Sequence, residues 1–240
     1  MKDQNNIVDI EENKTDFREN YITKAETTLL PVKVVPDGAT SVNRKIIDSK
    51  YYNSFNFSKL AEAFSNGKIT LGITSATRGE GKTLVAANMA VSLASGYRQK
   101  TLLVDMNFSR PQVHNVFGTT LSPGMAEAIS MEKIRVLPSG IDNLYLMTAG
   151  DIERLTPGIE HTLVLRQILY TLKNKFDFVI IDMNSILPIK NFPIHFINEI
   201  DGLINVIDRK NTKKGDFEKV FNHLKESQFV GYVYNRVDKT

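Results

Sequence analysis

The chain has 240 residues, of which 42% are hydrophobic and 24% charged, a composition typical of a soluble globular protein with one large or two small domains. It contains no cysteine, which excludes disulfide bonds and thiolate metal sites and is compatible with a reducing compartment. The net charge of +3 is too small to indicate nucleic-acid binding. No apolar run approaches the roughly 18 residues of a membrane helix, and the polar first residues do not resemble a signal peptide.

The N-terminal part of the chain differs in composition from the rest. Residues 1–45 are polar, mixed in charge and interrupted by Pro31 and Pro36, so we predict a disordered arm there and a folded domain over 46–240. Within this arm, the run 29–36 fits an extended docking segment and fits equally well an unstructured lead-in with incidental apolar residues.

From residue 46 onward, apolar runs of strand type alternate with runs of helical periodicity. Alternating strands and helices predict an α/β fold with a mostly parallel twisted sheet, helices on both faces and right-handed crossovers. We expect helices over 46–64, 84–95, 111–116, 122–131, 162–175 and 217–224, and strands over 69–74, 101–105, 134–137, 144–147, 176–182, 202–207 and 230–237.

A glycine-containing stretch, residues 75–83, joins the first of these strands to a helix. Its sequence is Ser-Ala-Thr-Arg-Gly-Glu-Gly-Lys-Thr, and strand, turn and helix are the context that a phosphate-binding loop requires. Backbone N–H groups of such a loop and the positive end of the helix bind phosphate oxygens. The alternative is a flexible surface turn, and Ala76 stands where the usual motif has its first glycine. The residues predicted to bind nucleotide are Thr77, Arg78, Gly79, Glu80, Gly81, Lys82, Thr83 and Leu84.

Two other predicted strands end in an acid. Asp182 closes the apolar run 178–181, as in a Walker B motif, where the acid holds Mg²⁺ directly or through water. It could instead cap the segment that follows. Asp105 closes the run 101–104. Because ligands of parallel α/β sheets lie beyond the carboxyl ends of the strands, we expect both acids and the phosphate loop to meet at one nucleotide.

The stretch from Asp105 to Pro111 resembles the Walker A′ motif of bacterial tyrosine kinases, the BY-kinase family of P-loop proteins that accompany polysaccharide co-polymerases in capsule and exopolysaccharide synthesis. The family motif reads Asp-x-Asp-x-x-Arg-Pro. Asp105, Arg110 and Pro111 match it, and Asn107 replaces the second acid. The segments 112–118, 122–125, 140–145, 149–150 and 176–182 also look like the family, so the resemblance runs from about residue 46 to the end.

The resemblance implies a P-loop nucleotide-binding domain over 46–240 that binds ATP and Mg²⁺. The catalytic residues would be Lys82, which stabilises charge on the phosphoryl group, Asp105 as general base for a tyrosine hydroxyl, Asp182, and Arg110. The implied metal ligands are Thr83, Asp182 and Asn107. The resemblance further implies a cytoplasmic protein at the inner face of the membrane, held there by a membrane polysaccharide co-polymerase, and a homo-oligomer.

Several features depart from the family pattern. Asn107 supplies an oxygen but no charge, the chain ends at Thr240 without a tyrosine-rich tail, and residues 51–60 lack the glutamate and arginines used in ring assembly. We therefore expect weak or partner-dependent tyrosine phosphorylation. Asn235 begins Asn-Arg-Val-Asp, which resembles a nucleotide-base-binding turn and fits equally well a simple strand-ending turn.

Three alternatives to an active kinase remain. The chain could be a degenerate relative that binds nucleotide as an assembly signal for a co-polymerase. It could be a positioning ATPase of the deviant-Walker class, although Thr77 stands where that class has a lysine. A GTPase is supported only by residues 235–238. The basic residues Arg209, Lys210, Lys213 and Lys214 are read as a solvated loop.

Overall fold

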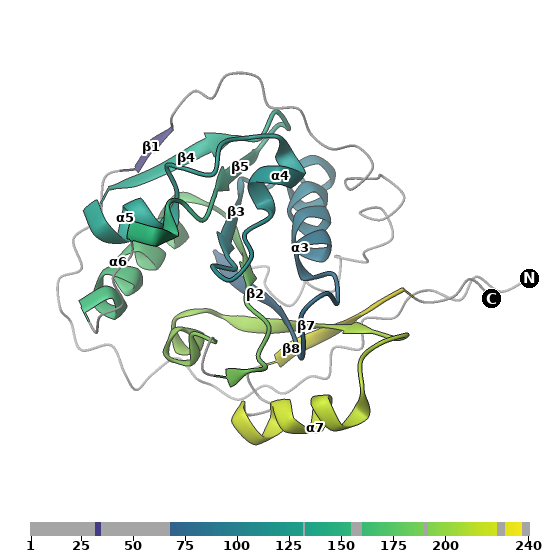
Figure 1. The fold of residues 1–240 in the computed structure, drawn as a ribbon. Coiled ribbons are helices and arrows are strands. Elements are labelled where there is room, and N and C mark those ends of the chain that lie inside the picture. Colours follow the sequence, from purple (N-terminus) through teal and green to yellow (C-terminus); the bar gives the residue numbers. More distant parts are fainter. Residues whose placement is uncertain are drawn as a thin grey trace, which may run out of the picture.

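The computed structural model describes residues 32–34, 68–131, 133–154, 160–189, 192–224 and 229–236 (Figure 1). The strands in these residues form one sheet in the order β1-β4-β5-β3-β6-β2-β7-β8. The strands are β1 Val32–Val34, β2 Ile69–Ser75, β3 Thr101–Met106, β4 Ile134–Pro138, β5 Leu144–Met147, β6 Phe178–Met183, β7 Gly202–Asp208 and β8 Phe229–Asn235.

The sheet is parallel except where β4 pairs with β5, which are antiparallel. Strands β2, β3 and β6 are buried along their whole length, as expected for parallel strands covered on both faces. Strand β2 lies between β6 and β7, so its carboxyl end is flanked by two other strand ends. This topology places the residues that follow β2, β6 and β7 next to one another.

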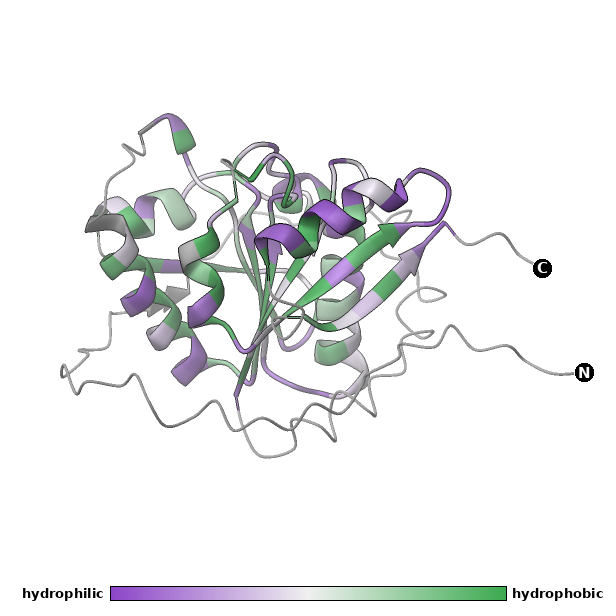
Figure 2. Ribbon diagram, turned by 90° about the horizontal axis from the view of Figure 1, so that it is seen from below, coloured by the Kyte–Doolittle hydropathy of each residue, from purple (hydrophilic) through white to green (hydrophobic). Residues whose placement is uncertain are grey.

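Helices cover both faces of the sheet. Side chains of α3 and α4 pack with one face in one apolar cluster, and side chains of α5, α6, η4 and α7 pack with the opposite face in another. Figure 2 shows the strands mainly in the hydrophobic colour, with hydrophilic segments on the surrounding helices. The helices are α3 Lys82–Val91, α4 Val113–Phe117, α5 Met125–Met131, α6 Glu160–Lys175 and α7 Lys214–His223, with short 3₁₀ helices at η2 Ile152–Arg154 and η4 Ile194–Glu199.

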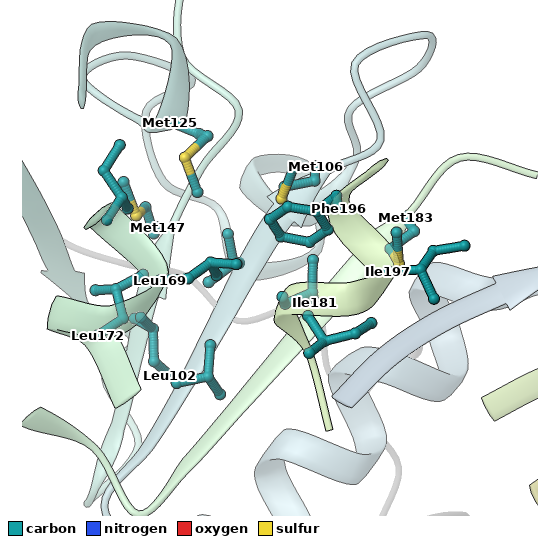
Figure 3. Close-up of a cluster of buried hydrophobic side chains, with 14 of the residues drawn as sticks. Leu102, Met106, Met125, Met147, Leu169, Leu172, Ile181, Met183, Phe196 and Ile197 are labelled. Carbon is teal, nitrogen blue, oxygen red and sulfur yellow. The ribbon is translucent and has the colours of Figure 1, made fainter. Parts of the chain in front are cut away.

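Small residues form part of the buried face of α3 and of the π-helical turn Ser92–Gly96 that continues it. Ala86, Ala87, Ala90 and Ala94 have no exposed surface, and all belong to the apolar cluster on this face. On the opposite face the cluster is built from longer side chains, among them Met106, Met183 and Phe196 (Figure 3). The helix that follows the phosphate loop is therefore held to the strands by these alanines together with longer side chains such as Val85 and Met89.

The predicted fold class is confirmed, and each strand predicted within the described residues is present. The structure adds details to the predictions. Helix α3 begins at Lys82 and ends in a π-helical turn at Ser92–Gly96, α7 begins at Lys214, and the 3₁₀ helix η4 was not expected. The antiparallel pair β4–β5 is compatible with the predicted, mostly parallel sheet.

The predicted helix over 46–64 and most of the arm over 1–45 lie outside the described residues. Within the arm, Val32–Val34 forms strand β1 at the edge of the sheet, paired with Ile134–Val136 of β4. In the described ranges no helix combines the length and the apolar character needed to span a bilayer.

Two glycines give a matched test of the packing. A Cβ at Gly124 would lie 2.2 Å from the backbone oxygen of Thr148, whereas a Cβ at Gly215 meets nothing within 4 Å. We expect Gly124→Ala to lower the free energy of unfolding by about 1–3 kcal/mol, because backbone must move. Gly215→Ala, near the start of α7, should raise it by about 0.5–1 kcal/mol. Urea denaturation measures both, and equal midpoints for the two variants would contradict the packing around Gly124.

Candidate functional site

The phosphate loop has the predicted position between a strand and a helix. Ser75 ends β2 and Lys82 begins α3, so the loop turns within six residues at the carboxyl edge of the sheet. Gly79 and Gly81 have φ angles of 86° and 97°, a left-handed conformation that side chains with a Cβ rarely adopt. The two glycines therefore allow the chain to turn into α3.

Lys82 lies inside the loop. Its side chain is buried, and Nζ donates a hydrogen bond of 3.0 Å to Ser75 Oγ. Burial lowers the pKa of Lys82, while the negative charges of Asp182 and Glu80 oppose this shift. The ammonium group is thus held over the loop, beside an acid of the neighbouring strand.

Asp105 and Asp182 lie side by side at the ends of β3 and β6, where they are paired in register. Both carboxyl groups are fully buried. Thr83 Oγ1 donates a 2.5 Å hydrogen bond to Asp182 Oδ2, and Asp182 Oδ1 is buried without a partner. Burial and the nearby Asp105 raise the pKa of Asp182 to about 8. The structure thus brings Asp182 into contact with Thr83 of the loop and places Asp105 beside Asp182.

The donor set around Asp182 fits Mg²⁺. A hydroxyl and a carboxylate in contact, with one carboxylate oxygen unsatisfied, are hard oxygen ligands, and Mg²⁺ in phosphate sites is commonly held by one or two carboxylates plus phosphates and water. In the described part of the chain no three His, Cys, Asp or Glu side chains gather as a dedicated metal cluster. A cation at this site would therefore need phosphate oxygens or water to complete its coordination.

Asp105 has a structural role that the sequence did not reveal. Its Oδ1 accepts from the N–H of Asn107 at 3.0 Å, and its Oδ2 accepts from those of Gln112 and Val113 at 2.9 and 3.0 Å. Burial raises the pKa of Asp105 to about 6 in spite of these three hydrogen bonds. The carboxylate thus holds the turn of residues 107–113 and joins it to the start of α4.

The other predicted residues of this turn are less enclosed. Asn107 is half-buried, and Arg110 is exposed, with its backbone N–H bonded to the Asn107 carbonyl. Asn184, which follows β6, accepts from the N–H of Ser109 through Oδ1. The structure therefore brings Lys82, Thr83, Asp105 and Asp182 together and leaves the Arg110 guanidinium at the surface.

The side chains of Glu80 and Asn235, both predicted to bind nucleotide, instead form hydrogen bonds with the backbone of the phosphate loop. The buried Glu80 carboxylate accepts from the Thr77 N–H at 2.8 Å and from the hydroxyl of Thr212. Asn235 Nδ2 donates to the Glu80 carbonyl at 2.9 Å. Thr212, Arg236 and Asp208 were not predicted as site residues. The available signal was in the sequence: Asp208 follows an apolar run, as Asp105 and Asp182 do.

Comparison with known proteins agrees with this geometry. The chain is 31% identical over 169 residues to the tyrosine-protein kinase YwqD of Bacillus subtilis, a match that covers 68% of this chain and 70% of YwqD. The chain belongs to the bacterial tyrosine kinase family. No protein-family model matches it.

Solved structures of low sequence identity share the fold. The chimerical protein CapA2B2 superimposes with a TM-score of 0.69 at 22% identity, over 80% of this chain and 85% of that one. The septum site-determining protein MinD of Pyrococcus horikoshii, solved with Mg-ADP, gives a TM-score of 0.59 at 23% identity, over 72% of both chains. The fold is thus that of P-loop NTPases.

The raised pKa values predict how stability depends on pH in the free protein. Both acids bind a proton more tightly when folded than when unfolded, where an aspartate has a pKa of about 3.9. The free energy of unfolding should therefore fall as the pH rises above about 4. The Asp105 proton contributes to this fall up to about pH 6, and the Asp182 proton contributes up to about pH 8. Asp182→Asn should remove the fall between pH 6 and 8.

Urea midpoints without Mg²⁺ or nucleotide measure this effect. Asp142→Asn, at an exposed position, is the matched control and should retain the wild-type pH profile. Parallel profiles for Asp182→Asn and wild type above pH 6 would contradict the raised pKa.

Proposed function

We propose that the protein is an ATP-dependent protein tyrosine kinase of capsule or exopolysaccharide synthesis. The observation that carries the proposal is the in-register pair Asp105–Asp182 beside Lys82 and Thr83, because phosphoryl transfer needs a cation site, a lysine and an acid at one point. Membership in the bacterial tyrosine kinase family, through similarity to a protein named as a tyrosine kinase, supports the assignment.

In this proposal the loop 75–83 binds the phosphates of ATP through backbone N–H groups and the first turn of α3. Lys82, held above the loop by Ser75, is placed to balance the negative charge that spreads over the transferring phosphoryl oxygens. Thr83, Asp182 and Asn107 would hold Mg²⁺, which neutralises phosphate charge when bound. A cation bound there would also be coordinated by Asp182 Oδ1, the oxygen that has no hydrogen-bond partner.

Asp105 is the proposed general base. A pKa of about 6 leaves it mostly ionised at neutral pH and close to the value at which proton transfer is efficient. The proton of the tyrosine hydroxyl passes to a carboxylate oxygen as the phenolic oxygen bonds to phosphorus and ADP leaves. Since Asp105 is buried and binds three backbone N–H groups, the turn of residues 107–113 must open for the substrate to approach.

The same contacts favour a second function, that of a nucleotide-dependent regulatory subunit that transfers no phosphate. In that case Asp105 serves only to hold the turn, and Asn107 marks the loss of the second metal-site acid. Both functions place the protein at the inner membrane face, bound as a homo-oligomer to a polysaccharide co-polymerase. They differ in whether phosphotyrosine forms.

Lys82→Met tests nucleotide binding. Removing a buried charge-assisted contact to phosphate should weaken ATP·Mg affinity by at least about tenfold, measured by calorimetry. Lys133→Met, at an exposed lysine before β4, is the matched control and should bind like wild type. Unchanged affinity of Lys82→Met would remove the basis of both functions.

Asn107→Asp tests the metal-site charge. If the missing carboxylate limits activity, this change should reduce the Mg²⁺ concentration for half-maximal tyrosine phosphorylation by roughly tenfold. The assay uses labelled ATP and the cytoplasmic tail of a cognate co-polymerase. Asn143→Asp, at the opposite edge of the sheet, is the control. A complete lack of phosphotyrosine in wild type and Asn107→Asp, while ATP is bound, would favour the regulatory function.

A further inference from the structure

We propose that the turn Asn235–Arg236, together with the residues that follow β7, is a positioning device that holds the phosphate loop in its binding conformation before nucleotide arrives. The proposal rests on the loop being the nucleotide site, as proposed above. It adds that contacts from the end of β8, which is 155 residues from Glu80 in the sequence, contribute to nucleotide affinity.

Asn235 is the first contact. Its amide nitrogen donates to the carbonyl of Glu80, and this nitrogen lies 2.2 Å from the position a Cβ of Gly81 would take. The Asn235 side chain is therefore packed directly against the loop backbone at the residue before α3. Glycine is required at position 81 both for this approach and for its φ of 97°.

Arg236 is the second contact. It adopts a left-handed φ of 56°, and its N–H donates to Asn235 Oδ1 at 2.9 Å. From this conformation Nη2 reaches the carbonyl of Gly79 at 3.3 Å, while Nη1 forms an ion pair with Asp208 Oδ2. Asp208 is 1% exposed, so the arginine is anchored on a buried acid.

The residues after β7 provide the third contact. Asp208 also accepts from the N–H of Lys210 and from Asn211 Nδ2, at 3.0 and 2.7 Å. Burial alone would raise the pKa of Asp208, but these hydrogen bonds and the charge of Arg236 lower it below its ordinary value. Thr212 accepts from the Asp208 N–H through its hydroxyl oxygen, and this hydroxyl donates to Glu80.

These contacts orient the loop for anion binding. In a planar trans peptide the C=O and the following N–H point in opposite directions. Holding the carbonyls of Gly79 and Glu80 on the β8 side therefore turns the N–H groups of Glu80 and Gly81 to the other side. A loop with two glycines loses much conformational freedom on ordering, and prior ordering removes this cost from nucleotide binding.

The test compares Arg236→Asn with Arg209→Asn. Asparagine tolerates left-handed φ, so the first variant removes the guanidinium with little backbone strain. The control removes an exposed arginine of the same edge, which bonds to the Asn235 carbonyl through its backbone N–H. Thr212→Val, which removes the hydroxyl contact to Glu80 at similar volume, is an independent second variant.

We expect Arg236→Asn and Thr212→Val to speed amide hydrogen exchange of residues 77–83 about tenfold in the nucleotide-free protein, with exchange in β2, β3 and β6 unchanged. Saturating ATP·Mg should restore protection. The KM for ATP should rise about tenfold with kcat unchanged, because bound nucleotide re-forms the loop.

Wild-type exchange rates over 77–83 in both variants would overturn the proposal, as would a uniform rise across the sheet, which indicates general destabilisation. A variant that does not fold is replaced by the other. Exchange in the free protein tests the positioning device without nucleotide. If wild type fails to bind ATP, the proposed function is wrong, and the exchange result still stands by itself.

Discussion

Two buried carboxyl groups on neighbouring strands constrain this structure. Asp105 and Asp182 cannot both be ionised in an apolar interior without compensation, since burial disfavours charge and like charges repel. The protein compensates them differently. Asp105 receives three backbone N–H groups, whereas Asp182 receives one hydroxyl and keeps one oxygen without a partner. The environment of Asp182 is therefore the one that a cation would complete.

The topology of the sheet assigns each acid-terminated strand a separate task. β2 carries the phosphate loop, β6 and β7 lie on either side of it, and β3 lies beyond β6. Asp182 on β6 contacts Thr83, Asp105 on β3 holds the turn 107–113, and Asp208 on β7 holds Arg236 against the loop. Each of the three acids, near the carboxyl end of its strand, thus fixes a different segment at this end of the sheet.

Much of this arrangement could be predicted from the sequence. The strands are short, mainly apolar runs, and the loop lies between one such run and a run of helical periodicity, so local patterns predict both. That Asp105 and Asp182 lie side by side at the end of the sheet that carries the loop follows from parallel pairing alone. Side-chain contacts could not be derived in this way. The binding of Asp105 to its own turn, and of Asn235 and Arg236 to Gly79 and Glu80, depends on backbone conformations set by tertiary packing. The antiparallel direction of β4 could not be predicted either, because short apolar runs carry no information on strand direction.

The burial of α3 has a consequence for movement. Every residue from Val85 to Val91 is buried, and a helix enclosed in a close-packed interior has little room to slide or tilt without steric overlap. The helix and the central strands should therefore behave as one rigid body when ligands bind and leave. Conformational change on ligand binding is then confined to the segments beyond the strand ends.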